Sequence, residues 1–324
     1  MISSPRSTIL FFIVSHILSL LPQASASPST SPNNVDFSPR GEFDRIPVER
    51  AEVLGSATTG MRKRATAYNN PADAGGYMLT IVNGTYPAGL GEPLNVILSG
   101  DSDSMVLVKS VDNGGFLNYM LTAGLGEECL GQHLGSDQSA NLGDGQGNVT
   151  EVEELRYNYG DPYIGTCQET FQGGLHLRYW IQNNTGAYFM AVSVEKSLTE
   201  GHDIVRDGYN IGRDHLIGNL TGQTVETRNV TNQTTLSGSG MYKNYTYQTD
   251  VQYVSGLLRN SSDDINHYYT VEQDGLPAID GLVAVMTVRI TARPQSSAAF
   301  ATLARMPVIA LLVPGFIAGV FSLF

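Results

Sequence analysis

The sequence predicts a single α+β domain over about residues 65–295, in which a mixed or antiparallel sheet carries one packed helix. Apolar and polar residues alternate over Leu175–Gln182, which is typical of a strand with two different faces. The turn at residues 183–186 and the apolar run Ala187–Val194 predict a second strand that completes an antiparallel hairpin. The pattern changes to a helical period over Asp203–Leu220. These three segments therefore favour a helix packed on a sheet.

The remaining predicted elements are shorter. Phe116–Ala123 is expected to be a helix, because Gly124 stands where helices commonly end. Residues 125–150 are dense in Gly, Asp, Asn and Gln and are expected to form a long loop. Further strands are expected over the apolar-rich segments Met78–Val82, Leu94–Leu98, Met241–Val254 and Leu282–Ala292.

Both ends of the chain have the composition of segments that are removed. Residues 1–26 combine one positive charge, an apolar run and an A-x-A-like cleavage site, which indicates a secretory signal peptide. Residues 27–64 lack periodic apolar positions and are expected to be disordered. They end in a tribasic run, so they are either a cleaved pro-segment or a solvated tail. Residues 296–324 have the layout of a glycolipid (GPI) attachment signal, with Ser296 and Ser297 as attachment sites.

The charge of the predicted domain excludes one class of partner. Between residues 65 and 295, 26 acidic and 11 basic residues give a net charge of −15. Nucleic-acid binding requires a basic surface, so we expect no nucleic-acid partner. We expect the outer face of the plasma membrane or the cell wall as the location, with the membrane as a partner through the lipid anchor.

A secreted location also gives roles to the two cysteines and to the glycosylation motifs. Cys129 and Cys167 are expected to pair, because a thiol beside Glu127 and Glu128 lacks the positive surroundings of a reactive one. Eight N-x-[ST] motifs are candidate glycosylation sites: Asn83, Asn148, Asn183, Asn219, Asn229, Asn232, Asn244 and Asn260.

One predicted strand and one predicted helix carry the residues that are best suited to catalysis or ligand binding. His176 and Arg178 share a face of the predicted strand, and His202 precedes the predicted helix. Polar residues of the helix could meet them, among which Asp207, Arg213 and Asp214 are candidates. A buried ion pair that holds the helix on the sheet is the first interpretation. A pocket for a small anionic ligand or phosphoester is the second, and a metal site is the third.

The motifs of enzymes and metal proteins give little further support. The sequence contains no Gly-x-Ser-x-Gly motif and no dense His-x-x-x-His spacing. Asp144–Glu154 resembles a calcium loop only faintly, because it lacks the Gly and Glu of that motif at its sixth and twelfth positions. We therefore expect no cofactor and no metal, and whether the protein is an enzyme stays open.

Three blocks together resemble the LssY C-terminal domain family over about residues 93–222. These blocks are Pro93–Gly100 (PLNVILSG), His176–Trp180 (HLRYW) and His202–Asp214 (HDIVRDGYNIGRD). They are similar to the family's opening strand, its His-x-Arg-aromatic-Trp strand and its Asp-x-x-Arg-Asp helix. The chain would be a secreted, fungal-like member. Bacterial members are joined to membrane segments related to lipid-phosphate phosphatases, so the resemblance implies a role at phospholipids.

The expected function is that of a GPI-anchored cell-surface glycoprotein, structural or ligand-binding, with unknown biochemical activity. The alternative is a phosphoester hydrolase or anionic-ligand binder. That alternative would use His176 and Arg178 of the strand together with the segment His202–Asp214.

Overall fold

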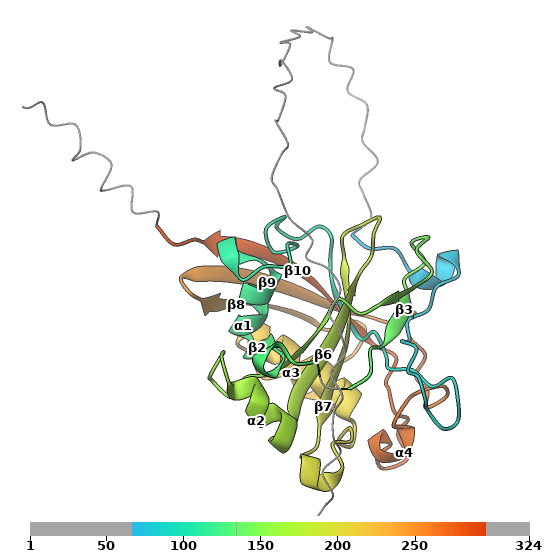
Figure 1. The fold of residues 1–324 in the computed structure, drawn as a ribbon. Helices are drawn as coiled ribbons and strands as arrows, with labels where there is room; N and C mark the ends of the chain where they lie inside the picture. Colours follow the sequence, from blue (N-terminus) through green and yellow to red (C-terminus); the bar gives the residue numbers. More distant parts are fainter. Residues whose placement is uncertain (1–66, 134, 296–324) are drawn as a thin grey trace, which may run out of the picture. The chain divides into compact units, whose positions relative to one another are not determined.

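A computed structural model describes residues 67–133 and 135–295, which form a single α+β domain (Figure 1). The predicted fold class is therefore confirmed. The predicted signal peptide, the segment 27–64 and the anchor signal lie outside the described residues. No helix of the described ranges combines the length and the apolar composition that a membrane crossing requires.

The domain is built on one curled sheet of eight strands, ordered β2-β5-β6-β7-β1-β10-β9-β8. Only β1 and β10 pair in parallel, and all other neighbours are antiparallel. The strands are β1 (Val96–Leu98), β2 (Leu125–Glu127), β5 (Glu153–Tyr157), β6 (Gly174–Ile181), β7 (Tyr188–Glu195), β8 (Thr235–Tyr242), β9 (Tyr245–Val254) and β10 (Val283–Ala292). A separate two-stranded sheet joins β3 (Ser139–Asn141) to β4 (Asn148–Thr150).

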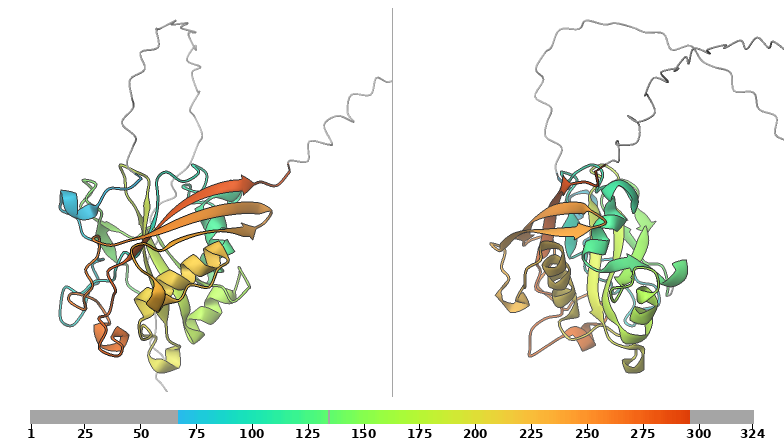
Figure 2. Two further views of the ribbon diagram at one scale, coloured as in Figure 1. Left: turned by 180° about the vertical axis from the view of Figure 1, so that it is seen from behind. Right: turned by 90° about the vertical axis from the view of Figure 1, so that its left-hand side faces the viewer.

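Helices are few and short. The α-helices are α1 (Phe116–Thr122), α2 (Gly165–Gln172), α3 (Gly208–Thr221) and α4 (Tyr268–Val271). Single 3₁₀ turns occur at η1 (Pro71–Ala74), η2 (Asp112–Gly114), η3 (Cys129–Gly131), η4 (Leu198–Glu200) and η5 (Thr227–Asn229). Figure 2 shows α3 beside the strands β8 to β10.

The two faces of the sheet bury separate hydrophobic clusters. Inside the curl, side chains from β6 such as Leu177 and Tyr179 pack with α1 and α3, including Phe116 and Leu216. On the outer face, Trp180 packs with apolar residues from the loops around residues 78–94 and 258–283. The alternation along β6 therefore separates two environments, as its sequence pattern predicts.

The hairpin predicted from residues 175–194 is confirmed as β6 and β7, with Trp180 opposite Phe189. The predicted helix at 116–123 is confirmed as α1. The predicted strand 241–254 is instead the end of β8 followed by β9. Lys243 and Asn244 turn the chain between the two strands, and both adopt positive φ angles.

Three further sequence expectations differ from the structure. The predicted loop at 125–150 contains β2, η3, β3 and β4, and the segment 78–82 makes only isolated bridges. The predicted helix at 203–220 begins only at Gly208. Asp207 has a φ of 57°, which a helix interior does not allow, and Ile204 pairs instead with Glu195 as a β-bridge.

Gly212 allows α3 to pack closely against β7. A Cβ at this position would lie 2.6 Å from the backbone Cα of Ser193 in β7. The glycine therefore allows the helix to touch the strand backbone directly. Beside this contact, the Asn95 amide donates to the carbonyl oxygens of Val192 and Tyr209, at 2.9 Å each, and so links strand and helix.

We predict that Gly212→Ala lowers the free energy of unfolding by about 1–3 kcal/mol, because the new methyl group overpacks the contact with β7. An alanine in an open helix would have the opposite effect. Gly126→Ala is the matched control, since its Cβ would meet only ordinary contacts, the nearest at 3.4 Å. Urea denaturation of the three proteins measures the difference. Equal stability of the Gly212 variant and the parent would contradict this close approach.

Candidate functional site

The outer face of β5, β6 and β7 changes from apolar to charged beyond Trp180. The strand register places Glu154 of β5 opposite Arg178 of β6, and Arg156 opposite His176. All four side chains lie on this outer face, because the intervening Leu155 and Leu177 point into the inner core. We use the term charge cluster for these four residues and the five that cover them: Glu128, Glu151, Glu169, Glu195 and His202.

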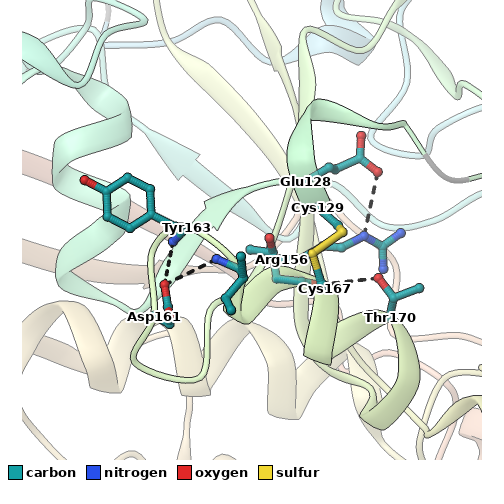
Figure 3. Close-up of a disulfide and its surroundings, with 9 residues drawn as sticks. Glu128, Cys129, Arg156, Asp161, Tyr163, Cys167 and Thr170 are labelled. Carbon is teal, nitrogen blue, oxygen red and sulfur yellow. Dashed lines mark hydrogen bonds and ion pairs between the residues drawn. A yellow bond between two sulfur atoms is a disulfide. The ribbon is translucent and has the colours of Figure 1, made fainter.

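The covering residues come from separate segments. Glu128 precedes η3, Glu169 belongs to α2, and Glu195 ends β7. The disulfide Cys129–Cys167 joins η3 to α2 beside Arg156, with a Cα–Cα distance of 4.6 Å (Figure 3). The predicted disulfide is therefore confirmed. The disulfide also positions two acids of the charge cluster. Cys129 follows Glu128 directly, and Cys167 lies two residues before Glu169.

Both arginines of the cluster are buried and engaged. Arg178 is 7% exposed, and its two terminal nitrogens lie 2.5 Å from Glu151 and from Glu154. Arg156 contacts Glu154 and also donates to Glu169 at 2.8 Å. Such contacts are required, because a buried charge without a partner costs several kcal/mol.

His176 is 3% exposed and lies between two carboxylates. Its Nε2 is 2.8 Å from Glu154, and its Nδ1 is 3.6 Å from Glu195. Burial alone would lower the pKa of His176, but these carboxylates outweigh it and raise the pKa to about 9. Burial would conversely raise the pKa of Glu154. The positive charges of His176, Arg178 and Arg156 outweigh that effect and lower the pKa to about 2.

The pKa values of two other buried acids of the cluster shift in the opposite direction to that of Glu154. Burial raises the pKa of Glu151 and of Glu169, although each contacts an arginine. Glu195 is less buried, and its Oε2 lies 3.2 Å from Nδ1 of His202. The cluster thus has a tightly paired centre and a more open end at Glu195 and His202.

The structure divides the six residues predicted from the sequence into two groups. His176, Arg178 and His202 belong to the charge cluster. Arg213 and Asp214 form a second network that ties α3 to the start of β10, where Arg213 donates to Asp214 and Asp280. Asp207 accepts a hydrogen bond from Asn210 next to that network.

The second network is a structural support for α3. The Arg213 guanidinium lies 5.1 Å from the ring centroid of Tyr253, whose hydroxyl donates to Asp214 at 2.7 Å. The arginine is fully buried, and five hydrogen bonds to Asp214, Asp280 and the Leu282 carbonyl engage all three of its nitrogens. The predicted ion pair of Arg178 with Asp207 or Asp214 is therefore wrong. Arg178 pairs with Glu151 and Glu154, and it is Arg213 that ties α3 to Asp280, just before β10.

Most acids of the charge cluster escaped the sequence analysis. One local signal was present: Glu154-Leu155-Arg156 repeats the charged-Leu-charged pattern of His176-Leu177-Arg178. Two neighbouring strands with this pattern in register place four charges on one face. Glu128 and Glu169 carry no such signal, because only the disulfide and the fold bring them to the strands.

The chemistry of the charge cluster favours cations over anions. Its two guanidinium groups already contact carboxylates, so an incoming phosphate would have to displace a buried acid. Its remaining groups are carboxylates and imidazoles. Two cavities elsewhere, about 470 Å³ beside α1 and about 480 Å³ near residues 257–265, are lined by other residues.

Comparison with known proteins adds no relative to this description: no family model, curated protein or solved structure matches the chain. The resemblance to the LssY C-terminal domain family stays a prediction from the three sequence blocks.

We predict that Glu154→Gln lowers the free energy of unfolding at pH 7 by about 3 kcal/mol, because Arg178, Arg156 and His176 lose a shared carboxylate. The folded pKa of about 2 lies below the ordinary value of 4.5. The carboxylate therefore stabilises the fold above pH 4.5, and this contribution is lost as the pH falls towards 2.

Urea denaturation of parent and variant between pH 7 and pH 3 measures this dependence. The difference in stability should shrink steadily below pH 4.5. Glu226→Gln is the control, because Glu226 is exposed and its loss should change stability by less than about 0.5 kcal/mol. A difference between parent and Glu154→Gln that is constant over this range would contradict the assignment.

Proposed function

We propose that the protein is a secreted cell-surface glycoprotein, held at the outer face of the plasma membrane or the cell wall by a GPI anchor. Its folded domain acts as a structural or ligand-binding module. The observation that carries this proposal is the exposure of its glycosylation motifs. Seven of the eight asparagines are exposed: Asn83, Asn148, Asn183, Asn229, Asn232, Asn244 and Asn260. A domain that folds with glycans attached needs this placement.

The disulfide supports the same location, because disulfides persist in oxidising compartments. The closed pairing of both arginine networks supports binding over phosphoester chemistry. Arg178 and Arg213 are held by different carboxylates in separate networks, so they do not converge on one substrate.

The remaining motif differs from the other seven. Asn219 is half-buried within α3, and its Nδ2 donates to the carbonyl of Ala123 at 3.1 Å. The hydroxyl of Thr221, which completes the motif, is buried and donates to Ile217 at 2.7 Å. A glycan on Asn219 would therefore collide with the packed surroundings of α3.

We predict that the protein secreted by eukaryotic cells carries glycans at exposed asparagines such as Asn232 and Asn244 but not at Asn219. Removal of the glycans by an amidase in ¹⁸O water, followed by peptide mass spectrometry, measures the occupancy of each site. The mass label at Asn219 should stay below a tenth of that at Asn232. Similar occupancy at both positions would contradict the packing of Asn219 in α3.

We predict that a phosphatidylinositol-specific phospholipase releases the protein from intact cells that express the full chain. Double substitution of Ser296 and Ser297 by leucine should abolish this release, because attachment requires small residues. Ser322→Leu is the matched control, since it alters only the apolar tail and should leave release unchanged. Retention of the parent protein with its tail intact would indicate a membrane span and overturn the anchor.

A further inference from the structure

Three potential metal ligands meet at the open end of the charge cluster. Glu169 comes from α2, Glu195 from the end of β7, and His202 from the segment after η4. Each offers one ligand atom, and the three atoms lie within 4.8 Å of one another. Zn²⁺ binds such atoms at about 2.0–2.2 Å, so modest side-chain rotations would bring all three to one ion.

An unpartnered buried atom gives this group its significance. The side chain of Glu169 is completely buried, and only its Oε2 is engaged, by Arg156 at 2.8 Å. Its Oε1 is buried without a hydrogen-bond partner among the described residues. An orphaned carboxylate oxygen in the interior is costly and calls for a water or a cation.

His202 shares this feature, and Glu195 orients it. The Nε2 atom of His202 is buried without a hydrogen-bond partner in the described part of the chain. The Oε2 atom of Glu195 is buried as well, and its printed contacts are ion pairs, with Nδ1 of His202 at 3.2 Å and with Arg156 at 3.6 Å. The Nδ1 atom of His202 lies 3.2 Å from the Glu195 carboxylate. That contact orients the ring and leaves Nε2 as the unused nitrogen.

The charge balance of the cluster also favours a cation. Its five carboxylates outnumber its two guanidinium groups and the His176 imidazolium, which leaves a net charge of −2 with His202 neutral, as metal binding requires. A divalent ion would offset this charge. The exposed fraction rises from 0% for the Glu169 side chain to 12% for Glu195 and 23% for His202. An ion can therefore enter from the His202 side.

We propose that Glu169, Glu195 and His202 bind a divalent transition-metal ion, with Zn²⁺ as the favoured occupant. One imidazole with two carboxylates suits Zn²⁺, whereas Ca²⁺ takes oxygen ligands only. Three protein ligands leave a coordination position for water or for an external group. This inference deepens the binding role proposed above and rests on it, because it names the ligand of the folded domain.

Two other groups of acids and histidines compete for the same ion, and both include His133. In one, Glu154 already faces two guanidinium groups and an imidazole. In the other, the Asp137 side chain is 64% exposed and pairs with His133 at 3.1 Å. That group also holds a buried unpartnered oxygen, Oε2 of Glu151. Both ring nitrogens of His133 are engaged, however, by Glu128 at 2.7 Å and by Asp137 at 3.1 Å, whereas Nε2 of His202 has no hydrogen-bond partner among the described residues.

The test uses the protein as secreted by eukaryotic cells, stripped with a chelator and titrated calorimetrically with Zn²⁺, Mn²⁺ and Ca²⁺. We expect one Zn²⁺ per chain, weaker binding of Mn²⁺ and none of Ca²⁺. His202→Gln should weaken Zn²⁺ binding by at least ~100-fold, because one of three ligands is lost. His215→Gln is the matched control on the exposed face of α3, and His133→Gln tests the competing groups. Both should bind like the parent.

A measurement on the parent protein keeps the test decisive if His202→Gln fails to fold. Zn²⁺ should protect His202, but not the exposed His215, from modification by diethylpyrocarbonate, as read by peptide mass spectrometry. Absence of Zn²⁺ binding, or binding that is lost in His133→Gln and kept in His202→Gln, would overturn the proposal. Either result would leave the release by phospholipase unaffected, so the two proposals can fail separately.

Discussion

The fold of this domain depends on carboxylates that neutralise the charges of two arginines buried on its sheet. Arg156 and Arg178 lie side by side on the outer face of β5 and β6, and on that face the two strands supply one acid, Glu154. An uncompensated buried charge costs about 3–5 kcal/mol, so further carboxylates must come from elsewhere in the chain. The segment before η3, the helix α2 and the end of β7 all contribute such an acid. Acidic segments therefore cover this face of the sheet because its two arginines need carboxylate partners.

The second arginine network shows the same principle at another place. Arg213 holds α3 against the start of β10 through Asp214 and Asp280, and it shares no residue with the charge cluster. Changes in the two networks should therefore act on stability independently. The close approach of Gly212 to β7 lies between them and fixes where the helix can lie. The helix is a structural support, whereas the charge cluster retains unpaired ligand atoms.

Local patterns predicted the elements that local interactions form. The alternation along residues 175–194 identified the β6–β7 hairpin and the face of each side chain, and the cysteines identified the disulfide. The start of α3 was predicted too early, because Asp207 adopts a left-handed conformation that periodicity does not reveal. The charge cluster was mostly missed. Its acids are spread from residue 128 to residue 195, and their meeting depends on the sheet register, which no short pattern encodes. For the same reason the sequence predicted no metal site.

The disulfide makes the assembly of the domain depend on where it folds. The helix α2 spans only two turns and carries Glu169, and isolated helices of this length are unstable in water. In a reducing cytosol the sheet could still form from its own hairpins, but nothing covalent would hold α2 and η3 over Arg156. Oxidation of Cys129 and Cys167 would therefore complete the outer face of the sheet. Protein made in a bacterial cytosol would form the strands of this fold but would lack the disulfide that holds the acidic residues Glu128 and Glu169 over Arg156.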